Sequence, residues 1–134
     1  MYNKIIVSLA LDHGYGPRAL ELARKLRAEG GHIIAVHVFE PVNSSVSSYV
    51  PSEYGEKILK SSKEVIAERI GDQKDIEAVV ISGHAGRAIT DYAAEVDADC
   101  IVVGSHKPGL RDFFLGSTAA RIVRYASCSV HVLR

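Results

Sequence analysis

The sequence predicts a doubly wound α/β domain in which helices cover both faces of a five-stranded parallel sheet. Five short runs rich in β-branched apolar residues alternate with longer segments whose apolar residues recur at helical spacing. A parallel neighbour cannot be reached through a tight turn, so this alternation implies right-handed strand–helix–strand units. The chain has 134 residues, a usual size for one domain, and we assign residues 1–134 to a single domain.

The predicted strands are the five apolar runs. The first four are almost uninterrupted by polar residues, which is typical of parallel strands that are covered on both faces. The fifth ends the chain with alternating apolar residues, and we expect it at an edge of the sheet. The strands are expected at residues 5–9, 32–38, 76–82, 100–104 and 129–133.

Four helices are expected between the strands. Residues 17–29 place Ala19, Leu20 and Ala23 on one face, and the pair Gly30 and Gly31 should end that helix. Residues 52–70 carry apolar side chains at mostly helical spacing, whereas the serine-rich residues 43–52 are expected to form a flexible connection. The other two helices are expected at residues 86–96 and 117–126.

The composition is that of a packed globular domain, with 47% hydrophobic and 24% charged residues. Sixteen basic residues balance sixteen acidic ones, so no overall field favours nucleic acid or an anionic membrane, and neither partner is expected. The apolar N-terminus is broken early by Asp12, unlike a secretory signal, and no apolar run has the length of a membrane span. Cys100 and Cys128 lie in apolar runs and are expected as free thiols of a cytoplasmic protein.

The segment from residue 104 to residue 123 carries the chemistry. Gly104 lets the chain leave a strand without a Cβ that would obstruct a ligand, and Gly116, Ser117 and Thr118 open the last helix. The unpaired N–H groups of a first helical turn and the positive end of the helix dipole favour an anion, and the two hydroxyls add donors. Phosphate is therefore the expected ligand.

The loop between these points is basic and contains a turn dipeptide. His106, Lys107 and Arg111 can lean over a phosphate chain, and Pro108 with Gly109 predicts a turn. The loop is neither a Walker A motif nor an early GxGxxG motif. The same residue types also serve as an ordinary helix N-cap and an ordinary turn, so both interpretations stay open on physical grounds alone.

The C-terminal run DADCIVVGSHKPGLRDFFLGSTAARIVRYASCSVHVLR resembles the signature of the universal stress protein family, whose ATP-binding members carry Gly-x2-Gly-x9-Gly-Ser/Thr. YNKIIVSL resembles the family's opening strand and AVHVFEP its second, so the similarity spans the whole chain. The resemblance implies a Rossmann-like fold of the adenine nucleotide alpha hydrolase type. It also implies that the protein binds ATP, ADP or AMP and acts as a nucleotide-responsive stress or signalling module.

Two departures from the family pattern bear on nucleotide affinity. Lys107 replaces the second glycine, and its separation from Gly116 is one residue shorter than in the pattern. This basic residue followed by Pro108 resembles a subclass of small bacterial members in which nucleotide binding is still expected. Ser-Leu-Ala at residues 8–10 replaces the usual Pro-x-Asp, so either Asp12 supplies the acidic group or nucleoside affinity is reduced.

The resemblance also implies a place for each part of the nucleotide. The adenine would lie against Leu9, Ala10 and Val38, with main-chain groups near Val38 and Val103 contacting its edge. The ribose would approach Gly104, Ser117 would make the main side-chain contact with phosphate, and Mg²⁺ could bridge the phosphates. The implied nucleotide-binding residues are Leu9, Ala10, Asp12, Val38, Val103, Gly104, Ser105, His106, Lys107, Pro108, Gly109, Gly116, Ser117 and Thr118.

No catalytic or metal-binding residue is assigned from the sequence. The six histidines lack the spacing of a helical zinc pair, and neither cysteine belongs to a CxxC motif. Family resemblance and the exposed edge predict a homodimer through Val130 and Val132 of the last strand. Arg121 and Arg124 are expected on a solvated face. Two other functions stay open: a dimeric interaction protein that has lost nucleotide binding, and a slow ATPase.

Overall fold

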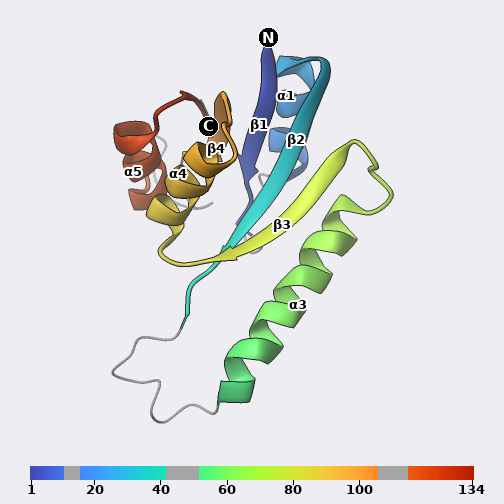
Figure 1. Ribbon diagram of the computed structural model, residues 1–134, viewed down its shortest axis with the longest axis vertical. Coiled ribbons are helices and arrows are strands. Elements are labelled where there is room, and N and C mark those ends of the chain that lie inside the picture. The colour runs from blue at the N-terminus through green and yellow to red at the C-terminus, as the bar shows by residue number, and fades with distance from the viewer. Residues whose placement is uncertain (11–15, 42–51, 106–114) are drawn as a thin grey trace.

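The computed structural model describes residues 1–10, 16–41, 52–105 and 115–134, and its strands and helices alternate along the chain (Figure 1). The last three strands have the predicted bounds, and the helix bounds after the first differ from the predictions by at most one residue. The elements are β1 (Tyr2–Ser8), α1 (Gly16–Leu26), β2 (Arg27–Phe39), α3 (Ser52–Ile70), β3 (Ile76–Ser82), α4 (Ala85–Glu95), β4 (Cys100–Gly104), α5 (Ser117–Tyr125) and β5 (Ser129–Leu133).

The sheet has the order β3-β2-β1-β4-β5, and every neighbouring pair is parallel. The predicted doubly wound α/β fold is therefore confirmed. The chain builds outward from β1 to β3 and then crosses to the other side of β1 to form β4 and β5. The strand order thus reverses between β1 and β4, and the carboxyl ends of these two strands mark the place where such sheets bind ligands.

Two apolar clusters lie on opposite faces of the sheet (Figure 1). Ile5 and Val7 of β1 pack with α1 and α3, whereas Ile6 between them packs with α4 and α5. This alternation is the two-residue period of a strand. All three side chains are fully buried, so β1 is covered on both faces. The burial of each side chain contributes about 2 kcal/mol of hydrophobic stabilisation.

The first helix ends earlier than predicted. α1 stops at Leu26 and β2 begins at Arg27, whereas the sequence predicted a helix through residue 29. Gly30 has a φ of 75°, and the register between β1 and β2 shifts in this region. A Cβ on Gly31 would lie 3.0 Å from the carbonyl oxygen of Tyr2. The two glycines therefore allow the irregular backbone at the start of β2. The prediction that they end the helix was wrong.

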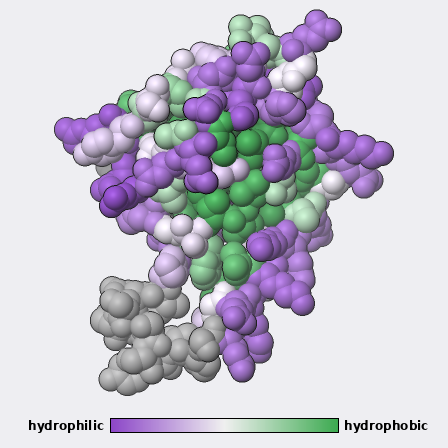
Figure 2. Space-filling model, viewed as in Figure 1, coloured by the Kyte–Doolittle hydropathy of each residue, from purple (hydrophilic) through white to green (hydrophobic). Residues whose placement is uncertain are grey.

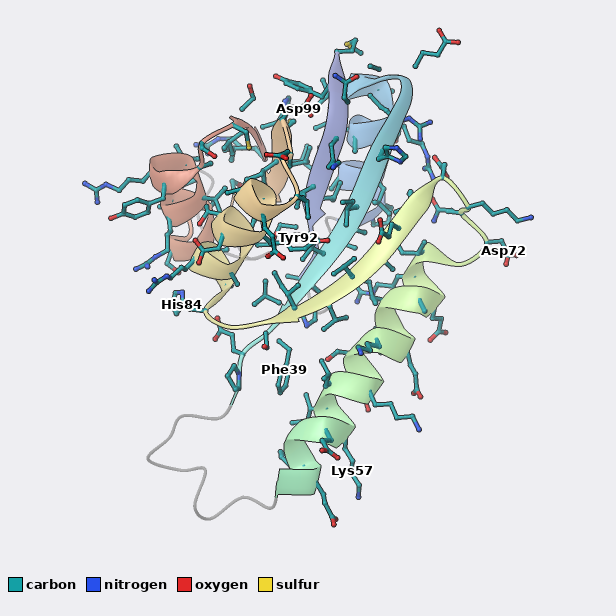
Figure 3. All side chains as sticks on the ribbon, viewed as in Figure 1. Phe39, Lys57, Asp72, His84, Tyr92 and Asp99 are labelled. Carbon is teal, nitrogen blue, oxygen red and sulfur yellow. The ribbon has the colours of Figure 1, made fainter. Side chains whose placement is uncertain are left out.

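Asp99 fastens the start of β1 at the amino end of the sheet (Figure 3). Its two carboxylate oxygens accept the main-chain N–H groups of Asn3 and Lys4, each at 2.8 Å, and its own N–H donates to the Lys4 carbonyl at 3.0 Å. The ammonium group of Lys4 donates to the carbonyl of Val96 at 2.6 Å, just past the end of α4. These bonds connect β1 with the turn before β4.

Both cysteines are free thiols. Cys100 is buried under α1 and α3, and Cys128 is partly buried on the opposite face. Burial raises the pKa of the Cys100 thiol to about 11, and it also raises the pKa of Cys128. None of the helices among the described residues has the length and apolarity that a membrane span needs.

Candidate functional site

The carboxyl ends of β1, β2 and β4 and the start of α5 meet at the point where the strand order reverses. The structure brings nine of the predicted nucleotide-binding residues to this end of the sheet. The other five, which are Asp12, His106, Lys107, Pro108 and Gly109, lie outside the described residues. The nine are Leu9, Ala10, Val38, Val103, Gly104, Ser105, Gly116, Ser117 and Thr118.

The N-cap residue of helix α5 is Gly116, with φ −61° and ψ 157°, and a glycine has no side chain with which to cap a helix. Among the residues that the structure describes, no side-chain cap hydrogen bond is present there. Ser117 is exposed and Thr118 is half-buried. The amides of Ser117 and Thr118 belong to the first turn and have no acceptor within the helix. Together with the helix dipole they form a positively polarised end that suits an anion.

The amide of Gly116 is used inside the protein. It donates to the carbonyl oxygen of Ser105 at 2.6 Å, so it is not aimed at a ligand. Ser105 is fully buried, and its own amide donates to the carbonyl of Leu133 at 2.8 Å. The end of β4 is thereby bonded to both the start of α5 and the end of β5. The main-chain N–H groups of α5 that can bind an anion are therefore those that follow Gly116.

Helix α4 begins at the same end of the sheet, but its start is occupied. Its first amide, on Ala85, donates to a carboxylate oxygen of Glu40 at 3.1 Å. The N-cap residue His84 is exposed and makes no side-chain cap bond (Figure 3). A carboxylate of this chain therefore fills the positive end of α4, whereas no side-chain cap hydrogen bond is present at the start of α5 among the described residues. Of these two helix starts, that of α5 is the one that suits a phosphate.

The loop after β1 is held by β2. The amide of Leu9 donates to the carbonyl of Val36 at 2.8 Å, and the carbonyl of Leu9 lies 3.1 Å from Nδ1 of His37. A carbonyl can only accept, so this bond requires the proton on Nδ1 of His37. His37 falls within the strand predicted at residues 32–38, and its residue type alone did not indicate this bond. Both main-chain groups of Leu9 are thus satisfied within the protein.

The three apolar residues predicted to contact adenine are not equivalent. The Leu9 side chain is only 5% exposed and packs in the cluster under α1 and α3. Val38 is half-buried and packs on the opposite face, with α4 and α5, and Ala10 is exposed. Ala10 and Val38 therefore have exposed surface that a base could contact, whereas the side chain of Leu9 is part of the core. Val103 is 4% exposed, so it can reach a ligand only through its main chain.

A resident protein metal site finds no support in these residues. In the part of the chain that the structure describes, no three side chains of His, Cys, Asp or Glu come together. What the arrangement offers is main-chain donors and hydroxyls at one end of a helix, which suits a phosphorylated ligand.

Comparison with known proteins agrees with this architecture. The model of the universal stress protein family matches residues 1–134. Universal stress protein Sll1388 of Synechocystis is 28% identical over 153 residues, covering 99% of this chain and 98% of that protein. Universal stress protein G of Salmonella typhimurium is 27% identical over 143 residues and covers both chains completely.

Solved structures show the same fold. The universal stress protein UspA from Lactobacillus plantarum superposes with a TM-score of 0.77 at 20% identity, covering 99% of this chain and 98% of that chain. A universal stress protein solved in complex with cAMP gives 0.64 at 23% identity, covering 99% and 97%. The universal stress protein from Archaeoglobus fulgidus in complex with dAMP gives 0.62 at 22% identity, covering 99% and 98%. With a family model that matches every residue, this chain belongs to the universal stress protein family.

Proposed function

We propose that this chain binds an adenine nucleotide, with ATP, ADP or AMP as candidates, and that it works as a nucleotide-responsive stress or signalling module. The observation that carries the proposal is the start of α5, which lies at the reversal of strand order and has a glycine as its N-cap, with no side-chain cap hydrogen bond from the described part of the chain. Two relatives of the same fold were solved with cAMP and dAMP, which supports an adenine nucleotide as the ligand class.

In this proposal the phosphates lie on the amides and hydroxyls of Ser117 and Thr118. The base lies against Ala10 and Val38, and the ribose lies near Gly104. The predicted contributions of Asp12, His106, Lys107, Pro108 and Gly109 stay predictions. Mg²⁺, where present, would be held chiefly by phosphate oxygens, because such a hard cation accepts water and phosphate ligands readily.

The signal would leave the site through β5. Ser105 is bonded to both α5 and β5, so a phosphate that shifts the start of α5 acts on the end of the edge strand. Val130 and Val132 are half-buried on this strand, and we propose that they pair with a second copy of the chain. Sedimentation of Val132→Lys tests this, because the variant should be monomeric where the native protein is dimeric. The cytoplasmic location expected from the sequence likewise stays a prediction.

A direct test identifies the nucleotide that leaves the purified protein on denaturation. Chromatography that finds ATP supports binding without rapid turnover. ADP or AMP alone would favour the slow ATPase, and an empty protein that also fails to bind added nucleotide would favour the interaction protein without a ligand.

A pair of matched variants tests the assigned site. Ser117→Asp adds a carboxylate at the start of α5, and Ser127→Asp adds one just past its end; both serines are exposed. An acidic residue in a first turn suits the helix dipole, so Ser117→Asp should keep the fold intact. It should nevertheless weaken ATP binding about tenfold by charge repulsion, equivalent to about 1.4 kcal/mol, and change adenosine binding little.

The control Ser127→Asp should bind ATP like the native protein. Isothermal titration with ATP, AMP and adenosine measures the native protein and both variants. Equal ATP affinity in the native protein and Ser117→Asp would remove the start of α5 as the phosphate site.

A further inference from the structure

The face of β2 and β3 beside α4 is apolar and only partly covered. The register places Val36 beside Val79 and Val38 beside Ile81, with these four side chains on the α4 side of the sheet. Val36 is fully buried, whereas Val79 and Ile81 on the edge strand are only partly buried. The apolar surface therefore becomes more exposed toward the β3 edge.

Figure 2 shows this surface as a hydrophobic area in the middle of the molecule, over the strands between α4 and α3. Tyr92 of α4 borders it and points over the sheet (Figure 3). We name the surface formed by Val79, Ile81 and Tyr92 the β3 face. α3 packs against the other side of β3 through Ile66 and Ile70, so it does not cover the β3 face.

Two acidic residues lie at the rim of the β3 face. Glu77 lies on the same side of β3 as Val79, two residues away, and Glu95 lies one turn after Tyr92 on α4. Both carboxylates are exposed. Burial raises the pKa of Tyr92, and the charges of Glu77 and Glu95 raise it further, so both carboxylates lie close to this ring. No ion pair within the described residues neutralises either one.

The partly buried apolar side chains of β3 lie beside a layer of helices. α4 and α5 form the layer on this side of the sheet, where the β2 side chain of Val36 is buried and the β3 side chains of Val79 and Ile81 are only partly buried. A helix about 10 Å wide laid beside α4 would extend the layer and cover β3. An apolar stripe on such a helix would bury Val79 and Ile81, and the flank of Tyr92 would form one wall.

We propose that the β3 face docks an amphipathic helix of a partner protein, with an aliphatic stripe on the sheet and Lys or Arg side chains paired with Glu77 and Glu95. These two carboxylates, which form no ion pair within the described part of the chain, favour a basic helix over an acidic one. Val38 borders both this surface and the proposed base position, so the test avoids it.

The probe is a designed 18-residue helix of leucine and lysine, and its counterpart carries glutamate in place of every lysine. ¹⁵N-labelled protein is titrated with each peptide and followed by amide chemical shifts. The Leu/Lys peptide should shift amides of β2, β3 and the Tyr92 flank of α4. The Leu/Glu peptide should bind at least tenfold more weakly.

The first test variant changes the rim and leaves the apolar side chains intact. The double variant Glu77→Lys, Glu95→Lys should weaken Leu/Lys binding about tenfold or more. The control Glu64→Lys reverses an exposed carboxylate on α3, which packs on the opposite face, and should bind like the native protein. Val79→Lys should also weaken binding, and thermal unfolding verifies that each variant is folded.

Four results would overturn the assignment. Equal binding of the two peptides, or shifts outside β2, β3 and α4, would show that the β3 face does not select a basic helix. Absence of binding by both peptides would remove it as a helix-docking surface. Sedimentation that shows a dimer of the native protein, dissociated by Val79→Lys, would assign the face to a second copy of this chain.

Discussion

Gly86 in the first turn of α4 allows α4 and α5 to pack closely. A Cβ at this position would lie 2.9 Å from Cβ, 3.0 Å from Cγ and 2.8 Å from Cδ of Arg121. Carbon atoms prefer separations of about 3.5–4.0 Å, so all three contacts are too short. The contact with Cβ of Arg121 cannot be relieved by a side-chain rotation. One of the two helices must therefore move when Gly86 is replaced by alanine.

The free-energy change follows from two opposing effects. Overpacking of this kind costs about 1–3 kcal/mol, and replacing a helical glycine by alanine returns up to about 1 kcal/mol. Gly86→Ala should therefore lower the free energy of unfolding by about 1 kcal/mol. Gly55→Ala is the matched control, because Gly55 also lies in the first turns of a helix and a Cβ there would meet nothing within 4 Å. It should raise stability by about 0.5–1 kcal/mol.

Urea unfolding followed by circular dichroism measures both variants. Arg121→Ala in the Gly86→Ala background should restore part of the loss, since it removes Cγ and Cδ but keeps Cβ. Because α5 carries the proposed phosphate donors, Gly86→Ala should also weaken ATP binding, whereas Gly55→Ala should not. Equal stabilisation by the two alanines would refute the close packing of α4 on α5.

Three further outcomes follow from contacts outside the site. Asp99→Ala removes the acceptor of two main-chain bonds at the start of β1 and should cost about 2 kcal/mol in urea unfolding. The Arg24 guanidinium lowers the pKa of Asp75 below its unfolded value of 3.8. The ionised carboxylate therefore stabilises the fold above pH 3.8, and this stabilisation is lost as the pH falls through the lower folded pKa. The free energy of unfolding of Asp75→Asn should therefore depend less on pH below about 4 than that of the native protein. Cys100, with its pKa raised to about 11, should resist thiol reagents at pH 8 until urea unfolds the protein, and measurable labelling of the native thiol would contradict its burial.

The strands and the topology could be predicted because their signals are local. Residues 76–82 and 100–104 are apolar runs bounded by turns, and a strand–helix alternation leaves few ways to arrange a parallel sheet. The end of α1 could not be predicted in the same way. Glycine is common after a helix, which is why Gly30 and Gly31 suggested a helix end. In the structure Arg27 already pairs with Tyr2 of β1, so β2 begins before these glycines. Tertiary pairing overrode a local stop signal.

The site was predictable in position but not in its hydrogen bonds. Ser117 and Thr118 lie at a helix start, as their residue types indicated. The hydrogen bond from Ala85 to Glu40 joins residues that are 45 positions apart in the sequence, so no local pattern predicts it. Arg121 has the charge of a solvated residue, and only the proximity of Gly86 shows that its carbon chain is a packing surface.

The shortened spacing after Lys107 need not move the proposed phosphate site. The amide of Gly116 bonds to Ser105, and Ser105 bonds to Leu133, so the start of α5 is tied to the ends of β4 and β5. A change in the number of residues between 105 and 116 alters the path between two points that the rest of the fold holds. The donors of α5 therefore keep their place relative to the sheet. Any change in nucleotide affinity relative to the family pattern should then come from the charge of Lys107 and the missing acidic residue at position 10.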